Sequence, residues 1–460
     1  MPLLIRNGEI ITADSRRRAD ILCEGETITR IGAGLEAPPG AQVVDAAGKY
    51  VFPGFIDPHV HITLPFMGTL AKDTYETGSR AALVGGTTTL IEMCCPSRAD
   101  DALAAFEHWM AQAAGRSACD FTFHMGATRF DAATESQLRE IVRRGISSFK
   151  IFLAYKGAFG IDDTELYRTL RLARELGVVV TAHCENETLV FERQKELIAA
   201  GKTEPGRHYE SRPPLVEAEG VHHLMTFAEL TGASTYIVHL SCKEALDEAV
   251  AARRRGVDVA IETLIQYLVL DKTYAERPGF EGAKYVMSPP LREAANQPVL
   301  WEGLKGGVIQ TVATDHAPFD FGDQKRMGAS DFTKIPNGIP SLEERIKLLY
   351  TFGVRAARID LNTLVNVAST QVAKTFDLYP RKGAIQPGSD ADLVVFDPDY
   401  RGVISAKTQH MNVDYSAFEG WKIEGRPSVV TVRGEVAVRD GEFVGDPARG
   451  RFLRRTPSRS

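Results

Sequence analysis

Eight short apolar runs recur through the middle of the chain, and amphipathic, helix-like segments separate them. The runs are Val51–Val60, Thr87–Cys94, Phe121–Met125, Ser148–Tyr155, Val178–His183, Thr235–Leu240, Val257–Thr263 and Val308–Asp315. Apolar strands that alternate with helices are typical of a parallel sheet covered on both faces. The eight repeats predict an α/β fold of the (β/α)8 TIM-barrel type, with chemistry at the C-terminal ends of the strands. An open doubly wound sheet is the alternative, but no GxGxxG follows the first strand.

One intervening helix is marked at both of its ends. Asp162 and Glu165 have the spacing of a capping box, and Gly177 is a typical helix stop. The apolar positions on one face between these signals are Leu166, Leu170, Ala173 and Leu176. The pattern therefore predicts an amphipathic helix between Asp162 and Gly177.

Both ends of the chain show short alternating strands and tight turns instead. The expected strands lie within Leu3–Ile11, Asp20–Ile31, Gln42–Val51, Ala391–Phe396, Ser428–Val432 and Glu435–Arg439. Neither end supplies enough strands for a stable β-domain, so we expect both to form one small β-sandwich beside the barrel. The expected division is a sandwich part over 1–52, the barrel over 53–380, a second sandwich part over 381–444 and a C-terminal arm over 445–460.

The composition narrows the class of protein. The 460 residues are 44% hydrophobic and 25% charged, which is ordinary for a globular protein. The formal net charge of −6 argues against a nucleic-acid partner. No apolar run reaches the roughly 18 residues of a membrane helix, and the first residues lack a secretory signal. The six cysteines form no CxxC pair, so we expect a reduced, cytoplasmic protein without a membrane partner.

His59 and His61 follow the first apolar run and are separated by one residue. Residues i and i+2 of a strand share a face, so both imidazoles can reach one metal ion. Two packed or solvated histidines are the alternative explanation.

Three more polar residues lie at the ends of other runs. His183 ends the fifth run, His239 nearly ends the sixth and Asp315 ends the eighth. These strand ends meet at one end of a barrel, so the side chains should converge on His59 and His61. Neutral imidazoles and a carboxylate are ligands for zinc or a similar divalent ion.

Lys150 lies inside an apolar run, where a buried ammonium would cost several kcal/mol. Such a lysine pairs with an acid, serves as an amine of lowered pKa, or is chemically modified. Four histidines and one aspartate bring only one negative charge to two divalent ions. Carboxylation of Lys150 by CO2 would supply a bridging anion with two oxygens.

Six segments together resemble the hydantoinase/dihydropyrimidinase family of cyclic amidohydrolases, within the urease-like superfamily. They are Pro53–His61, Gly85–Thr89, Ser148–Lys156, Met287–Arg292, Asp331–Gly338 and Gly388–Val394. The resemblance covers essentially the whole chain. The segments around Ser288 and Asn337 are more specific for this family than the histidines, which the wider superfamily shares.

The resemblance implies a binuclear metal centre, most simply with two zinc ions. His59 and His61 would hold one ion together with Asp315, and His183 and His239 would hold the other. An N6-carboxylated Lys150 and a hydroxide would bridge the two ions.

The resemblance also implies an enzyme that opens small cyclic ureides by hydrolysis. The substrates would be 5-substituted hydantoins, with D-selectivity, and dihydropyrimidines, and the products N-carbamoyl amino acids. Asp315 would carry the proton from the hydroxide to the leaving nitrogen, and the Tyr155 hydroxyl would bind the oxyanion. Backbone groups of Ser288 and Asn337 would meet the ring, and the exocyclic group would lie among Leu64, Phe66, Phe152 and Phe159.

Other assignments remain open at this point. The stretch from Asp315 to Pro318 also resembles dihydroorotases, although His61–Leu64 lacks the arginine that a substrate carboxylate would need. Allantoinase is a further alternative. A non-catalytic assembly protein of the same fold would lack the metal ligands, all of which are present here. His316 could lie behind Asp315 or face solvent.

The resemblance further implies a homotetramer, or a homodimer. The arm after Val444 could then pack on a neighbouring subunit.

Overall fold

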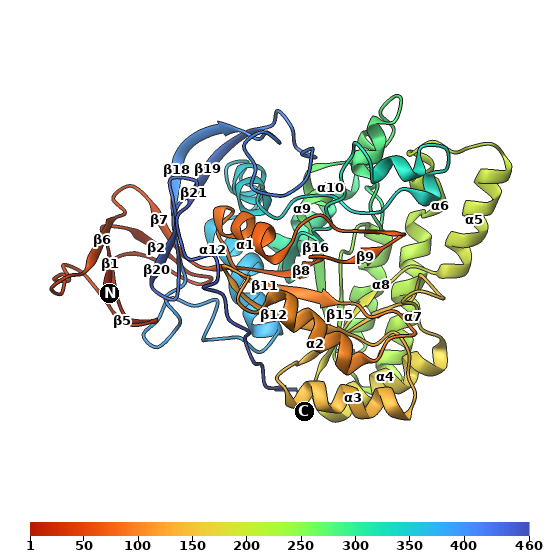
Figure 1. The fold of residues 1–460 in the computed structure, drawn as a ribbon, viewed down its shortest axis with the longest axis horizontal. Coiled ribbons are helices and arrows are strands. Elements are labelled where there is room, and N and C mark those ends of the chain that lie inside the picture. Colours follow the sequence, from red (N-terminus) through yellow and green to blue (C-terminus); the bar gives the residue numbers. More distant parts are fainter. Residues whose placement is uncertain (460) are drawn as a thin grey trace.

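Eight parallel strands form one continuous sheet in the computed structural model, which describes residues 1–459 (Figure 1). In spatial order they are β8 (Phe55–Val60), β11 (Thr87–Cys94), β12 (Asp120–Gly126), β13 (Ser148–Phe152), β14 (Val179–His183), β15 (Thr235–Ile237), β16 (Val259–Leu264) and β17 (Thr311–Ala313). Every neighbouring pair is parallel, and spatial order follows chain order. The predicted (β/α)8 barrel is therefore confirmed.

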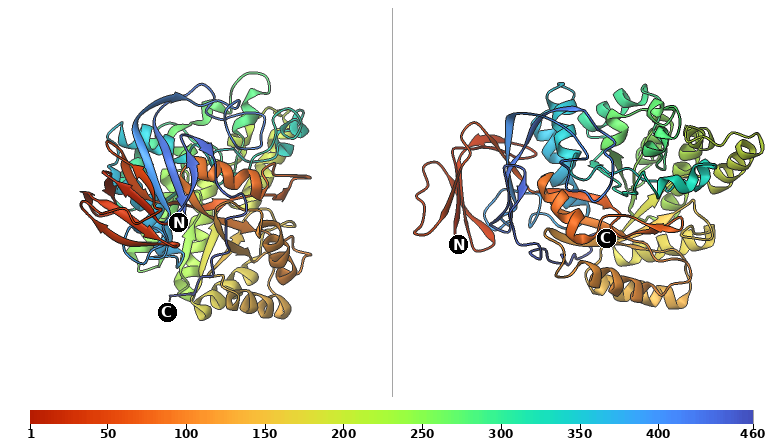
Figure 2. Two further views of the ribbon diagram at one scale, coloured as in Figure 1. Left: turned by 60° about the vertical axis from the view of Figure 1, so that its left-hand side comes forward. Right: turned by 45° about the horizontal axis from the view of Figure 1, so that its top comes forward.

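Helices connect these strands and pack around the sheet (Figure 2). The longer ones are α1 (Tyr75–Val84), α2 (Ala102–Ala113), α3 (Ala132–Arg143), α4 (Asp163–Leu176), α5 (Glu187–Ala199), α7 (Pro214–Thr231), α8 (Lys243–Arg254) and α10 (Asn296–Lys305). Short α-helices are α6 (Arg207–Ser211), α9 (Ile265–Val269), α11 (Arg345–Leu348), α12 (Leu361–Val365) and α13 (Gln371–Thr375). Helix α4 begins directly after Asp162, which forms a capping box with Glu165, and it is capped at its C-terminal end by Gly177, whose φ is 67°, as the sequence predicts.

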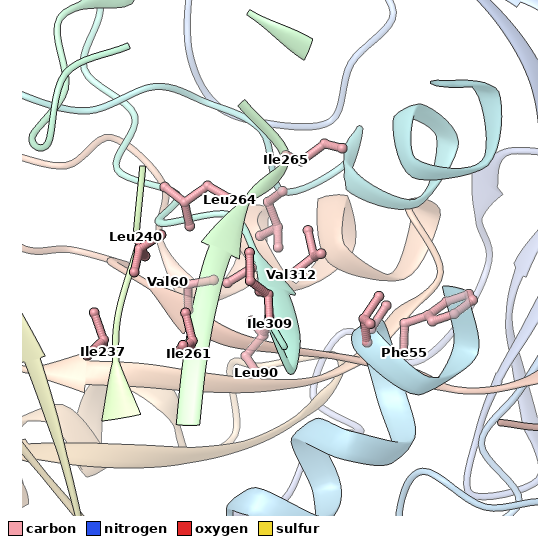
Figure 3. Close-up of a cluster of buried hydrophobic side chains, with 14 of the residues drawn as sticks. Phe55, Val60, Leu90, Ile237, Leu240, Ile261, Leu264, Ile265, Ile309 and Val312 are labelled. Atoms are coloured by element: carbon pink, nitrogen blue, oxygen red, sulfur yellow. The ribbon is translucent and has the colours of Figure 1, made fainter. Parts of the chain in front are cut away.

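Apolar side chains from the strands and the segments that follow them pack into one large core. Figure 3 shows part of this core, which includes Phe55, Leu90, Ile261 and Val312. This packing leaves the strand ends as the place where polar side chains gather.

Side-chain contacts bring the first and last strands together. The Arg345 guanidinium is fully buried and donates to the carbonyls of Ile56 in β8 (2.8 Å) and Val312 in β17 (2.9 Å). The Thr314 hydroxyl, just after β17, donates to the Asp57 carboxylate at 2.7 Å. These contacts fix the end of β17 beside β8.

Strands from both chain ends form a two-layered sandwich at one side of the barrel (Figures 1 and 2). One sheet holds β1 (Leu3–Arg6), β4 (Asp20–Glu24), β5 (Thr27–Gly32) and β6 (Gln42–Asp45). The other holds β2 (Glu9–Ile11), β3 (Arg16–Arg18), β7 (Tyr50–Pro53), β18 (Leu393–Val403), β19 (Lys422–Val432), β20 (Glu435–Arg439) and β21 (Glu442–Phe443). Strand β7 pairs antiparallel with β18, so the expected sandwich of both ends is confirmed.

The first apolar run differs from the prediction, because it is two strands rather than one. It breaks at Gly54, between β7 of the sandwich and β8 of the barrel. A Cβ atom at Gly54 would lie 2.1 Å from Thr88 Oγ1, so only glycine fits this close passage.

A buried ion network joins the sandwich, the barrel and the C-terminal arm. Lys382 Nζ lies 2.6 Å from carboxylate oxygens of Asp120 and Asp392 and 3.0 Å from Asp390. Asp120 also accepts from Arg433 and from the backbone N–H of Arg451. Because buried charges need partners, these groups fix the three parts against one another.

The C-terminal arm packs on its own barrel, close to α3 (Figure 1). Leu453 is fully buried, and the Arg455 N–H donates to the carbonyl of Gly145. Arg455 also reaches Thr122 and Ser148 with its guanidinium. A role of the arm between subunits stays a prediction, and Ser460 lies outside the described residues.

No helix within residues 1–459 is long and apolar enough to cross a membrane. All six cysteines are buried and carry free thiols.

Candidate metal centre and substrate pocket

The first ligand group lies where β8 meets the end of β17. His59 is in β8, His61 follows that strand, and Asp315 comes shortly after β17. Asp315 Oδ1 lies 3.1 Å from His59 Nε2 and 2.9 Å from His61 Nε2. The three ligand atoms are all within 4.8 Å of one another, which fits a single metal ion.

A second pair of imidazoles lies beside this group. His183 ends β14, and His239 follows β15. Their Nδ1 and Nε2 atoms, respectively, face each other at 2.9 Å. The His59 and His239 rings have centroids 5.4 Å apart, so the two groups adjoin.

Two of these side chains are carried on unusual backbone. His239 has φ of 43° and Asp315 has φ of 48°, although neither is glycine. Such left-handed conformations cost about 1–3 kcal/mol each and concentrate at functional sites. Here they turn the side chains of His239 and Asp315 toward the other ligands.

Lys150 lies in β13 with its side chain fully buried at the same end of the barrel. Its Nζ has no hydrogen-bond partner among residues 1–459. Burial lowers the pKa of Lys150, which favours the neutral, nucleophilic amine. A neutral amine of this kind can react with CO2, so the carboxylation of Lys150 suggested by the sequence is chemically possible.

Buried carboxylates hold the outward nitrogens of two histidines. Glu262 Oε1 lies 2.8 Å from His59 Nδ1, and Glu262 also accepts from Tyr236. Glu185 Oε2 lies 2.8 Å from His183 Nε2. Carboxylate partners of this kind orient metal-binding imidazoles and set their tautomer.

The sequence-based prediction missed both of these glutamates. A signal for Glu262 was present, because it is an acidic side chain near the C-terminal end of the run Val257–Thr263, whereas the other acid, Asp258, lies at its start. Glu185 gives no such signal, since its role depends on Arg212 from a distant segment.

Burial and neighbouring charged groups together set the pKa values of the histidines and of Glu185. Burial lowers the pKa of His183 and His239, so both rings are neutral and able to bind a metal. Burial also acts to lower the pKa of His59, but Asp315 and Glu262 outweigh it and raise that pKa to about 9. Although burial opposes ionisation of Glu185, Arg212 and His183 hold its pKa at about 2.

The donor set therefore fits a divalent ion at the His59, His61 and Asp315 group, with two further imidazoles beside it. Four imidazoles present nitrogens to the same space, and Asp315 adds a carboxylate. The unpartnered Lys150 amine lines that space too. A metal ion at His59 would displace the proton that the neighbouring carboxylates stabilise.

The ligands form the floor of a small pocket with a cavity volume of about 50 Å³. Every site residue predicted from the sequence lines it: His59, His61, Leu64, Phe66, Lys150, Phe152, Tyr155, Phe159, His183, His239, Ser288, Asp315 and Asn337. Cys95, Ala317 and Gly338 complete the lining and were not predicted.

The polar side of the pocket is held together by its own contacts. Asn337 Nδ2 donates to Ser288 Oγ at 3.0 Å, and His208 Nε2 lies 3.1 Å from the same oxygen. Burial raises the pKa of Tyr155 despite the nearby Arg212 guanidinium, so its hydroxyl is a neutral donor. No motif or strand-end position in the sequence points to His208 or Arg212.

Aromatic rings form the apolar side of the pocket. Phe159 lies with its ring centroid 5.5 Å from that of Phe152 and 6.3 Å from that of Phe66. Leu64 belongs to the same cluster, and Phe66 lies in the short hairpin of β9 (Pro65–Phe66) and β10 (Thr69–Leu70). This wall suits an apolar substituent.

His316 lies behind the ligands and not in solvent. It is fully buried, with Nε2 2.8 Å from Asp73 and Nδ1 accepting from the Ser341 N–H. Its backbone carbonyl accepts from the His61 N–H at 2.8 Å. His316 thereby ties the segment after β17 to the segment after β8.

Comparison with known proteins agrees with this geometry. The amidohydrolase family matches residues 50–437. A D-hydantoinase of Geobacillus stearothermophilus is 47% identical over 99% of this chain and 97% of its own length.

Two solved structures extend the comparison. The D-hydantoinase (dihydropyrimidinase) of a Thermus species is 65% identical, with a TM-score of 0.98 over 99% of both chains. The L-hydantoinase (dihydropyrimidinase) of Arthrobacter aurescens is 31% identical, with a TM-score of 0.89 over 98% of this chain and 99% of that one. The chain therefore belongs to the amidohydrolase family and, within it, to the hydantoinases and dihydropyrimidinases.

Proposed function

We propose that this protein is a metal-dependent cyclic amidohydrolase that opens 5-substituted hydantoins, D-selectively, and dihydropyrimidines to N-carbamoyl amino acids. The observation that carries the proposal is the pocket floor, where four imidazoles, Asp315 and the unpartnered Lys150 amine converge. The similarity to D-hydantoinases supports the D-selectivity.

The metal centre in this proposal contains two divalent ions, most simply Zn²⁺. His59, His61 and Asp315 would hold one ion, and His183 and His239 the other. Lys150, carboxylated at Nζ, would bridge them. When bound at these residues, the two ions would supply a hydroxide nucleophile at neutral pH and would act as Lewis acids toward the amide carbonyl.

The side chains of the pocket have separate tasks. Asp315 would accept the proton of the nucleophile and pass it to the leaving ring nitrogen. The neutral Tyr155 hydroxyl would donate to the developing oxyanion, a contribution of about 2.7–4 kcal/mol in comparable sites. Backbone groups of Ser288 and Asn337 would bind the –NH–CO– edge of the ring and hold it flat.

The exocyclic group of the substrate would lie against Leu64, Phe66, Phe152 and Phe159. These rings already fill much of the space between them, as their short centroid distances show. Phe159 and Cys95 also line a neighbouring cavity, together with Trp109. Phe159 therefore lies between the substrate pocket and this neighbouring cavity.

We propose a cytoplasmic homotetramer, or homodimer, as the working form. Buried free thiols are compatible with a reducing compartment. Large apolar side chains are exposed on α5 and at the start of α7, namely Leu189, Phe191 and Leu215. Such side chains support a subunit contact on this side of the barrel.

The proposed reaction is tested with hydantoin and dihydrouracil, with and without a chelator. We expect both rings to open, activity to be lost on metal removal, and added Zn²⁺ to restore it, because the nucleophile depends on the metal. Product is measured as the N-carbamoyl acid. Faster opening of allantoin or dihydroorotate would favour those activities instead, and a metal-loaded protein that opens none of these rings would refute the proposal.

The bridging role of Lys150 is tested by Lys150→Ala. We expect less than the full complement of metal and a loss of activity greater than about hundredfold, since even outer partners of metal ligands contribute 10–100-fold. A short carboxylic acid should restore part of the activity by replacing the bridge. The matched control is Lys156→Ala, because Lys156 is exposed on the following loop. Normal metal content in Lys150→Ala would contradict the bridge.

The role of Phe159 is tested by Phe159→Ala. Removing the ring opens space toward the neighbouring cavity, so hydantoins with substituents larger than phenyl should gain about tenfold in kcat/KM relative to hydantoin itself. Phe130→Ala is a suitable control, because Phe130 lines a separate groove. An unchanged ratio in Phe159→Ala would remove this residue from substrate selection.

A further inference from the structure

A buried lysine that the proposed reaction does not use connects the two segments that carry Ser288 and Asn337. Lys325 begins a short 3-10 helix, η3 (Lys325–Gly328), in the chain after β17. Its side chain is completely buried. It does not line the substrate pocket, so it has no direct access to the substrate.

The Lys325 ammonium donates to three backbone carbonyls. Nζ lies 3.1 Å from the oxygen of Val286, 2.6 Å from that of Pro336 and 2.8 Å from that of Gly338. An ammonium has three donors, so its hydrogen-bonding capacity is used completely. All three acceptors belong to the two segments that carry the pocket residues.

The three carbonyls lie close to the two pocket residues in the sequence. Pro336 and Gly338 are the two neighbours of Asn337, and Val286 lies just before Ser288. The two segments also meet directly, because the Gly338 N–H donates to the Val286 carbonyl at 2.9 Å. Lys325 therefore fixes the backbone on both sides of Asn337 relative to the segment of Ser288.

Gly338 shows how closely this wall is packed. Its φ is 154°, and a Cβ atom there would lie 2.2 Å from the Ala317 carbonyl oxygen. Ala317 and Gly338 both line the pocket. A small displacement of the Asn337 segment would therefore change the shape of the pocket directly.

Burial of this charge is costly, and no carboxylate within residues 1–459 pairs with it. Burial lowers the pKa of Lys325 to about 7, whereas the three carbonyl acceptors that face Nζ favour its charged form. A buried cation of this kind is expensive to keep. The lysine brings three backbone carbonyls to one point, and this structural effect explains why a buried cation is present here.

A separate group fixes the Ser288 side chain. His208 is buried, and its Nε2 lies 2.9 Å from the Met287 carbonyl and 3.1 Å from Ser288 Oγ. His208 thus acts on the hydroxyl side of Ser288, whereas Lys325 acts on the backbone before it. The two groups constrain the same segment from different directions.

We propose that Lys325 is a positioning residue for the substrate, which sets the spacing between the Ser288 and Asn337 segments by binding three of their carbonyls. The inference rests on the proposed function, in which backbone groups of Ser288 and Asn337 bind the –NH–CO– edge of a cyclic ureide. Lys325 would act on substrate binding and leave the metal ligands unaffected.

The direct test is Lys325→Met, which keeps an unbranched side chain one atom shorter than lysine and removes every donor. With hydantoin and dihydrouracil, KM should rise about ten- to hundredfold, the cost of a misplaced binding group. Effects on kcat should be smaller, and the metal content should equal that of the wild type. Lys334→Met is the matched control, because the Lys334 side chain is 69% exposed in the next short helix. That control should keep the wild-type KM.

Lys325→Gln provides a graded comparison and covers the case in which the methionine variant folds poorly. Its amide retains two donors, so its KM should lie between those of the wild type and Lys325→Met. Lys325→Met or Lys325→Gln with wild-type KM would overturn the proposal. An equal loss of metal and kcat in both variants would overturn it as well, because it would indicate general damage to the fold.

Amide hydrogen exchange separates this inference from the proposed function. Residues 283–289 and 335–339 should lose protection in Lys325→Met, while β13 and β14 should keep it. If the wild type opens no cyclic ureide, the proposed function fails. Hydrogen exchange alone then decides whether Lys325 sets the spacing between the Ser288 and Asn337 segments. Unchanged exchange in both segments would overturn the positioning role whatever the activity.

Discussion

A buried guanidinium lies at the centre of the contacts that close the barrel between β8 and β17. Arg345 binds carbonyls of both strands, and Thr314 binds Asp57 across the same boundary. This boundary carries His59 and His61 on one side and Asp315 on the other. The contact that completes the barrel therefore also brings together the first group of metal ligands, and strain in the Asp315 backbone completes their approach.

The remaining polar groups of the site follow from burial. Imidazoles and an amine taken out of water need partners or must lose their charge. Glu262 and Glu185 provide partners for His59 and His183, and Glu185 is itself held ionised by Arg212. Lys150 receives no such partner within the described chain, which is what makes a chemical change of its amine the consistent explanation.

Local sequence signals predicted the fold and the pocket floor, and distant contacts account for what they missed. The apolar run Thr87–Cys94 matches β11, and polar residues at strand ends identified the four histidines and Asp315, because parallel strands must end together. Lys325 and Arg345 could not be recognised in this way. Each is an ordinary cation in the sequence, and its partners lie in segments that only the folded chain brings near. The division of Val51–Val60 into β7 and β8 was missed for a similar reason, since only packing against Thr88 shows why Gly54 interrupts the run.

The metal content of protein purified without a chelator tests the central claim most directly. The proposed pair of divalent ions would explain both imidazole groups and the buried Lys150 amine together. Elemental analysis should give two divalent ions per chain, with zinc the most abundant. A folded, chelator-free protein that holds no metal, and takes up none when Zn²⁺ is supplied, would contradict the account.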